Sequence, residues 1–160
     1  MERPPVTIHY LGHHPAFADK LGEWSWNEWR HIYEQRGQTR EHALRNYRER
    51  INLDKIPIAL IALSERGDLV GTVSLKTEDL EVRSEITTWL GGLYVLPEWR
   101  KRGVGSVLME RAVNEARRLK LPTIHLWTSS AEKLYTSLGW RVVERMDYGG
   151  KPIVLMQFFL

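Results

Sequence analysis

A run of cations and glycines lies between an apolar, strand-like segment and an amphipathic, helix-like segment. Residues 100–106 read Arg-Lys-Arg-Gly-Val-Gly-Ser, and the helical pattern begins near Val104. The first N–H groups of a helix have no internal partners and carry partial positive charge, so they bind anions. Glycines at 103 and 105 let the backbone approach such a ligand closely. The segment therefore predicts a phosphate-binding loop.

Two other glycine-rich phosphate loops do not fit this segment. A dinucleotide fingerprint needs a third glycine at position 108, where the chain has Leu108. A Walker A loop needs Gly-Lys followed by Ser or Thr, and the run has no such order. What the run matches is Arg-x-x-Gly-x-Gly, with Arg100, Gly103 and Gly105 at its fixed positions, preceded by Leu-Tyr-Val-Leu-Pro at 93–97.

A second block, from Ile124, reads Ile-His-Leu-Trp-Thr-Ser-Ser-Ala-Glu-Lys-Leu-Tyr-Thr-Ser-Leu-Gly-Trp. Together the two blocks resemble the GNAT superfamily of acyl-CoA-dependent N-acyltransferases, in which a short strand, an Ala-x-x-x-Tyr helix and Leu-Gly-Phe/Trp follow the coenzyme A loop. The matching positions are Ala131, Tyr135, Leu138, Gly139 and Trp140. Thr128 departs from the pattern, since the family more often has Asn there, and its hydroxyl would make a shorter hydrogen bond to the pantetheine arm.

The resemblance implies acetyl-CoA as cosubstrate and no metal. The Leu93 backbone N–H would meet the thioester carbonyl, the Val95 backbone would pair with pantetheine like an added strand, and the amides of 101–106 would hold the diphosphate. The implied cofactor-binding residues are Leu93, Tyr94, Val95, Arg100, Lys101, Arg102, Gly103, Val104, Gly105, Ser106 and Thr128. The histidines show no spacing typical of metal ligands.

Acyl transfer to an amine needs a neutral amine, a donor for the developing oxyanion and a proton for the leaving thiolate. Tyr135 is the candidate general acid, because a phenol with a pKa near 10 stays protonated at neutral pH. The alternative is that its ring only packs beneath the cofactor.

Glu85 is the candidate base, because it lies just before the strand that would carry the acyl site. It would take the proton of the incoming ammonium directly or through water. Glu78, Asp79 and Glu81 precede it in the same connection. The alternative is a solvated acidic loop.

Aromatic residues crowd the first predicted helical region, which contains Trp24, Trp26, Trp29 and Tyr33. Helical spacing places the last three near one face and Trp24 toward another. The resemblance implies that this region forms one wall of the acceptor site, and aromatic rings bind ammonium groups by cation–π contact. Ordinary core packing is the alternative for at least one face. With the acidic connection, these residues lead us to expect cationic acceptors with an apolar portion.

The length and composition indicate one globular domain over residues 1–160, and the order of its predicted strands and helices indicates the α/β class. The chain has 42% hydrophobic and 27% charged residues, a formal net charge of +3 and no cysteine, which excludes disulfides and a cysteine nucleophile. The longest apolar stretch, 56–63, is far shorter than the roughly twenty residues that cross a bilayer. The N-terminal Met-Glu-Arg-Pro-Pro lacks the apolar segment of a signal peptide. We therefore expect a cytoplasmic protein.

Hydrophobic periodicity predicts strands that alternate with helices. The expected strands cover 6–11, 56–63, 69–75, 87–96, 123–127, 140–146 and 153–159, and the expected helices cover 15–33, 39–52, a segment from 104 and 130–138. The strands at 56–63 and 69–75 form a predicted hairpin. This pattern indicates a mixed central sheet flanked by helices. The resemblance further implies a fourth strand that splays at Gly91-Gly92 to admit the acyl group.

The leading function is N-acetyl transfer from acetyl-CoA to a primary amine of a small molecule, a peptide or a protein N-terminus. A non-catalytic acyl-CoA-binding sensor or partner module is the alternative. Binding of RNA is a third hypothesis, through Arg40, Arg45, Arg48 and Arg50, but Glu41 and Glu49 interleave these arginines and argue against nucleic acid. A homodimer is left open.

Overall fold

The computed structural model describes residues 4–160, so the first three residues of the expected domain lie outside the described part. It shows a single α/β domain. The strands are β1 (Val6–Tyr10), β2 (Ile58–Ser64), β3 (Leu69–Lys76), β4 (Trp89–Val95), β5 (Thr123–Thr128), β6 (Arg141–Tyr148) and β7 (Lys151–Phe159). The helices are α1 (Ala18–Gln35), α2 (Arg40–Arg48), α3 (Val104–Arg118) and α4 (Glu132–Ser137).

All seven strands form one mixed sheet, in the order β1-β2-β3-β4-β5-β7-β6. The pair β4–β5 is parallel and the other neighbouring pairs are antiparallel. The predicted hairpin is confirmed as β2–β3, with Ile58 opposite Leu75. The expected mixed sheet flanked by helices is confirmed.

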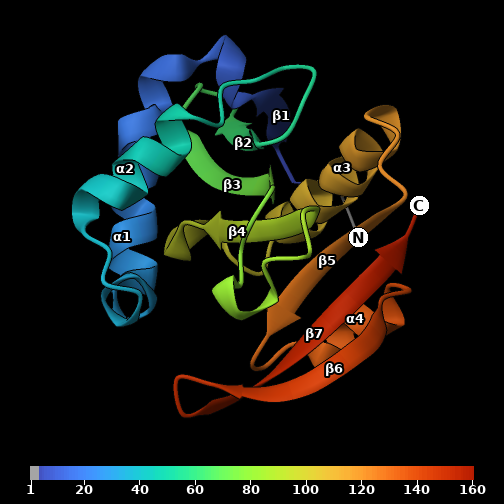
Figure 1. Cartoon of the computed structure of the whole chain (residues 1–160). Helices are drawn as coiled ribbons and strands as arrows, with labels where there is room; N and C mark the ends of the chain where they lie inside the picture. The colour runs from blue at the N-terminus through green and yellow to red at the C-terminus, as the bar shows by residue number, and fades with distance from the viewer. Residues whose placement is uncertain (1–3) are drawn as a thin grey trace.

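The strands β4 and β5 separate almost as soon as they meet. Their register consists of one pair, Trp89 opposite His125, whereas β5 pairs with β7 along its whole length. Gly92 has a φ of +64°, which favours glycine, and the register between β3 and β4 shifts at Thr72/Ser74. The ribbons of β4 and β5 diverge visibly in Figure 1. The expected splay of the fourth strand is therefore present.

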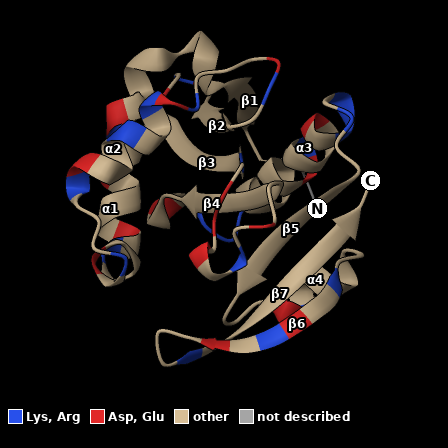
Figure 2. Cartoon of the chain, viewed as in Figure 1, with Lys and Arg blue, Asp and Glu red and all other residues tan. Residues whose placement is uncertain are grey.

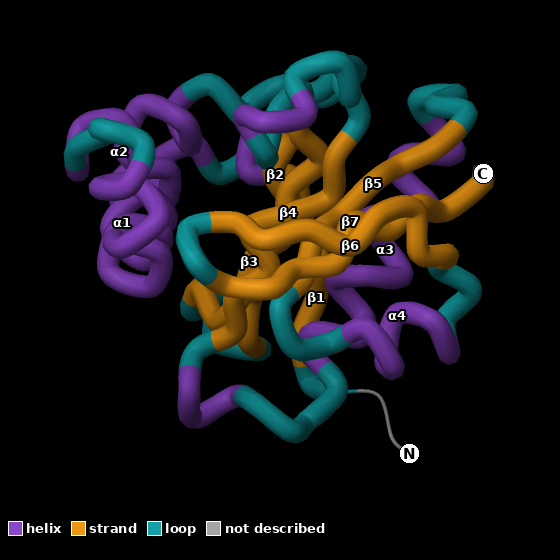
Figure 3. The backbone as a smooth tube through the Cα atoms, turned by 60° about the horizontal axis from the view of Figure 1, so that its bottom comes forward, coloured by secondary structure: helices purple, strands orange, loops and turns teal. Residues whose placement is uncertain are grey.

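Helices cover both faces of the sheet. Figures 1 and 3 show α1 and α2 together on one side and α3 and α4 on the other. On β2, Ala59 and Ile61 pack in the cluster with α1 and α2, whereas Ile58 and Leu60 pack in the cluster with α3. This two-sided burial explains why the β2 segment is continuously apolar rather than alternating.

The helices differ from expectation at their ends. Residues Pro15–Phe17 form a separate 3₁₀ turn, and α1 then runs to Gln35 with non-helical backbone angles at Trp29. Helix α2 begins after a capping box between Thr39 and His42 and stops at Arg48, before the expected end at 52. No helix within residues 4–160 has the length and apolar character needed to span a bilayer.

Leu108 of α3 anchors this helix against the sheet. Its side chain is 0% exposed and its Cδ1 lies close to Gly71 of β3. We expect Leu108→Ala to lower the free energy of unfolding by about 3 kcal/mol, because it leaves a cavity in the core. The same truncation at Leu134, which is 56% exposed on α4, should change it by less than about 1 kcal/mol. Urea denaturation measures both, and equal losses would contradict this account of the core.

Candidate active site

The loop before α3 presents unpaired backbone donors. Gly103 precedes the helix with a φ of +86°, and Lys101 has a φ of +62°. The first turn closes with the Val107 N–H donating to the Gly103 carbonyl at 3.1 Å. The N–H groups of Val104, Gly105 and Ser106 precede that bond, so they have no acceptor within the helix.

Gly105 is not required by the fold around it. A Cβ atom placed on Gly105 meets nothing within 4 Å, and its φ lies outside the left-handed range. A side chain there would project into open space beside the free N–H groups. The glycine is therefore explained by a ligand that approaches the backbone closely.

The cations of the loop lie around its rim. Arg100 donates from Nε to the Val95 carbonyl at 2.8 Å, and its guanidinium lies 5.5 Å from the Tyr94 ring centroid. Arg102 stacks over Trp99 at 5.0 Å. These cations favour an anionic ligand at the loop.

The separation of β5 leaves one edge of β4 open. The Leu96 N–H donates to the Val70 carbonyl of the β3 segment, and successive residues of a strand direct their backbone groups to opposite edges. Leu93 and Val95 therefore direct theirs away from β3, toward the open edge. An extended ligand can pair there as a strand would.

Two cavities meet at this edge. The smaller, of about 300 Å³, is lined by Val95, by residues 100–101 and 103–106 of the loop, and by part of α4. The larger, of about 650 Å³, is lined by α1, α2, the β3–β4 connection, β5 and the β6–β7 turn. Leu93 and Tyr135 line both cavities.

Tyr135 is held on α4 with its ring against the core. The ring meets Trp140 edge-on, with centroids 6.1 Å apart. Burial raises the pKa of the Tyr135 phenol. The hydroxyl therefore keeps its proton through the neutral range, where it can serve as a donor.

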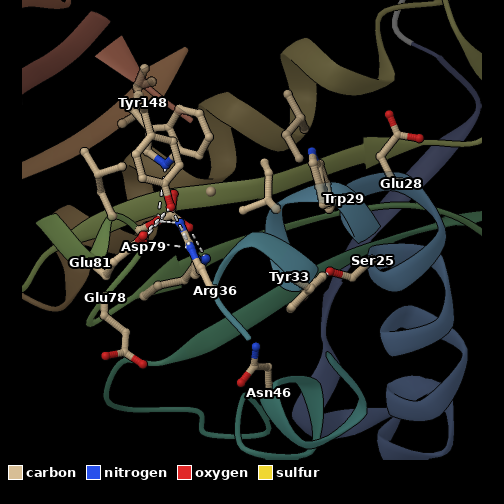
Figure 4. Close-up of a pocket in the computed structure, with 18 of the residues that line it drawn as sticks. Ser25, Glu28, Trp29, Tyr33, Arg36, Asn46, Glu78, Asp79, Glu81 and Tyr148 are labelled. Atoms are coloured by element: carbon tan, nitrogen blue, oxygen red, sulfur yellow. Dashed lines mark hydrogen bonds and ion pairs between the residues drawn. The ribbon is translucent and has the colours of Figure 1, made fainter. Parts of the chain in front are cut away.

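The kinked helix α1 forms an aromatic wall of the larger cavity. Trp29 and Tyr33 line it, and the Tyr33 hydroxyl lies 2.6 Å from the Ser25 hydroxyl (Figure 4). Trp24 instead packs on Tyr94 at 5.3 Å, and Trp26 packs on Tyr33 at 5.7 Å. The cavity therefore receives only part of the tryptophan cluster.

Acidic residues at one end of the larger cavity are paired with cations. Asp79 forms an ion pair with Lys76. Glu81 lies 2.8 Å from Nε of Arg36 and accepts a hydrogen bond of 2.6 Å from the Tyr148 hydroxyl (Figure 4). Burial, first of all, and this bond raise the pKa of Tyr148, whereas Arg36 lowers it. The carboxylates of Asp79 and Glu81 are therefore paired and do not form a free acidic patch.

The profile of the acetyltransferase (GNAT) family matches residues 18–140, which is most of the chain. The chain belongs to this family. Solved GNAT structures share its fold. The acetyltransferase of the GNAT family from Streptococcus pneumoniae superposes with a TM-score of 0.70 at 16% identity, covering 97% of this chain and 99% of its own. No curated protein matches the chain.

Two further structural neighbours were solved with coenzyme A or acetyl-CoA bound. An aminoglycoside 6'-N-acetyltransferase complexed with coenzyme A has a TM-score of 0.69 at 19% identity, with 96% of each chain covered. The yncA protein of Salmonella typhimurium, with its cofactor acetyl-CoA, has a TM-score of 0.69 at 22% identity and covers 96% of this chain and 93% of its own. At these identities the likeness establishes the fold.

Most of the GNAT loop residues lie at the smaller cavity, but three predicted residues lie elsewhere. The Tyr94 ring packs against α1, and Arg102 lies outside the lining of both cavities. Thr128 lines the larger cavity, and its Oγ1 accepts backbone N–H bonds from Ser130 at 3.3 Å and Ala131 at 3.0 Å. Its hydroxyl therefore shapes the turn into α4.

Glu85 is exposed on the turn before β4 and does not line either cavity. Its neighbours Glu78, Asp79 and Glu81 line the larger one. The β3–β4 connection therefore contributes three acidic residues to the cavity lining, but Glu85, the candidate base, is not one of them.

Sequence reasoning assigned no role in this site to many residues of the larger cavity, among them three cations and a tyrosine. None of these four belongs to a GNAT motif, and in the sequence each reads as an ordinary polar or turn residue. The four are Arg36, Arg50, Lys76 and Tyr148. The one available signal was the Tyr-Gly-Gly turn, which marks Tyr148 as the end of a strand.

Helix α2 does not present a basic face. Figure 2 shows both signs of charge mixed along α1 and α2. The ion pairs are Arg40–Glu23, Arg48–Asp19 and Arg48–Glu41. Arg45 is exposed and Arg50 is buried. The arrangement gives no support to nucleic-acid binding. Within residues 4–160, no cluster of His, Asp and Glu could hold a metal ion.

The two loop glycines should respond oppositely to alanine. Gly103→Ala should destabilise the protein by about 1 kcal/mol or more, because L-residues are strained at positive φ. Gly105→Ala should stabilise it by about 0.5 kcal/mol, because a side chain fits there and restricts the unfolded chain. Chemical denaturation of both variants measures the difference. A loss of stability in Gly105→Ala would show that the fold itself requires this glycine.

Proposed function

We propose that this GNAT protein transfers an acetyl group from acetyl-CoA to a primary amine of a small molecule, a peptide or a protein N-terminus. The amine attacks the thioester directly. One observation carries the proposal: Leu93 and Tyr135 line both cavities. A cofactor in the smaller cavity and an acceptor in the larger one would meet between these two residues.

The residues present fit acetyl-CoA. The free N–H groups at the start of α3 and the open space at Gly105 suit a diphosphate. The open edge of β4 suits the extended pantetheine arm. The GNAT neighbours solved with coenzyme A and with acetyl-CoA support the same assignment.

Acetyl-CoA supplies an acyl group that is already activated as a thioester. The backbone N–H of Leu93 stabilises negative charge that develops on the carbonyl oxygen. Tyr135 donates its phenolic proton to the departing sulfur. The splay between β4 and β5 gives the acyl group its space.

The amine must lose a proton before it can attack. As the base, Glu85 stays a prediction, and it would act through water because it does not line the cavity. The cytoplasmic location also stays a prediction, and a homodimer is left open.

Gly105→Asp tests the cofactor assignment. It places a carboxylate against the diphosphate, so we expect acetyl-CoA affinity to fall by at least about tenfold while the fold is kept. Asn114→Asp adds the same charge at an exposed position farther along α3 and serves as the control. Isothermal titration calorimetry measures both. Unchanged affinity in folded Gly105→Asp would refute the loop assignment, whereas binding without turnover of any amine would favour the non-catalytic acyl-CoA-binding module.

Tyr135→Phe tests the general acid. We expect kcat to fall by roughly ten- to a thousandfold, with acetyl-CoA affinity little changed, because the ring stays and the proton is lost. The raised pKa of Tyr135 places any loss of activity from its ionisation above pH 10, so wild-type kcat should not decline between about pH 7 and 9. Tyr10→Phe, which removes a hydroxyl bonded to Glu115 at 2.7 Å, is the matched control. Full turnover in Tyr135→Phe would make Tyr135 a packing residue.

A further inference from the structure

Arg50 is a buried cation that forms no ion pair with any carboxylate of residues 4–160. Its residue is only 6% exposed. Its Nη1 donates to the Ser74 hydroxyl at 3.1 Å, and its guanidinium stacks on the Tyr47 ring at 4.4 Å. Burying an unpaired charge is unfavourable, so such a residue calls for an explanation.

The guanidinium lies beside the acyl-transfer point. A Cβ atom on Gly92 would lie 3.7 Å from Nη1 of Arg50, and Gly92 directly precedes Leu93. Arg50 lines the larger cavity. Every fully buried side-chain nitrogen or oxygen in the described residues has a hydrogen-bond partner. Nη1 has the Ser74 hydroxyl as its acceptor, so Nε and Nη2 retain some contact with solvent at a residue that lines the cavity.

The neighbouring charges cannot supply the missing anion. Asp79 is paired with Lys76, and Glu81 is paired with Arg36 and Tyr148. Burial chiefly lowers the pKa of Lys76; Asp79 raises it, and the charges of Arg50 and Arg36 lower it further. Five carboxylates line the cavity, those of Glu28, Glu49, Glu78, Asp79 and Glu81. Among residues 4–160, none of them forms an ion pair with Arg50.

We propose that Arg50 binds a carboxylate of the acceptor, so that the acceptors are amines with a carboxylate a few bonds from the nitrogen. A guanidinium binds a carboxylate through two parallel hydrogen bonds. Arg50 opens to the larger cavity, whereas the coenzyme A loop lines the smaller one, so the acceptor carries the carboxylate. This inference rests on the proposed function, and it replaces the purely cationic acceptor expected from the sequence.

Two sources offer this chemistry: the α-carboxylate of a free amino acid, and the side chain of an acidic residue at a peptide N-terminus. Leucine is compared with leucinamide for the first. Peptides that begin with Asp are compared with the same peptides that begin with Asn for the second. Coenzyme A release gives kcat/KM for each. Wild type should prefer the carboxylate member of at least one pair by about 10- to 100-fold.

Arg50→Gln should abolish that preference by lowering kcat/KM for the carboxylate acceptor alone. The amine of leucinamide is less basic than that of leucine, so the ratio within a pair is compared between proteins at one pH. Arg48→Gln, which makes the same change on the exposed side of α2, should keep the wild-type ratio. Acetyl-CoA affinity should be unchanged in both variants. Arg50→Lys keeps the charge but loses the two parallel donors of the guanidinium, so it should reduce the preference severalfold. This variant tests the inference even if Arg50→Gln fails to fold.

Several results would overturn the inference. The first is that wild type turns over both members of each pair without preferring the carboxylate. The second is that Arg50→Gln keeps the preference. The third is that Arg50→Lys shows the same preference as wild type. Better use of succinyl-CoA than acetyl-CoA, lost in Arg50→Gln, would place the carboxylate on the acyl group instead. Each of these leaves acyl transfer to an amine standing. If no amine of the panel releases coenzyme A, the proposed function fails and this inference fails with it.

Discussion

The parting of β4 from β5 after Trp89 and His125 is the constraint on which the rest of the site depends. A fully paired sheet would satisfy the backbone groups of Leu93 and Val95 internally and leave no edge for a ligand. Because the strands separate, α4 can place Tyr135 near that edge, and the two cavities can meet there. Gly92 allows β4 to turn away from β5 without backbone strain, because glycine readily adopts its positive φ.

Several charged residues that line the larger cavity are paired with one another. The network of Arg36, Tyr148, Glu81, Lys76 and Asp79 satisfies its own members. Such a network fixes the geometry of the wall and takes little part in selecting ligands by charge. Arg50 lies outside this network, and we therefore expect it to select a carboxylate ligand.

The elements that depend on short-range residue spacing could be predicted from the sequence. The loop at 100–106, the helix face of α3 and the β2–β3 hairpin follow from short spacing rules, and the structure confirms these elements. The aromatic wall of the larger cavity was predicted in part, since Trp29 and Tyr33 line it. The base and the charged residues of that cavity could not be predicted from local spacing. Glu85 and Glu81 look equivalent in the chain, and only tertiary packing brings Glu81 to the cavity. Arg50 lies beyond the end of α2, where the chain turns inward, so the helical spacing that predicts an exposed arginine no longer applies.

The β6–β7 turn reaches the end of α1, where Gly149 approaches Gln35 and Tyr148 bonds to Arg36. The wall of the larger cavity is therefore assembled from distant parts of the chain, whereas the smaller cavity is lined by residues of the stretch 93–138. Insertions, deletions or exchanges in the hairpin can remodel one cavity without disturbing the other. This modularity offers a route by which a single acyl-donor apparatus acquires new acceptors during evolution, and by which the hairpin can be grafted between relatives in design.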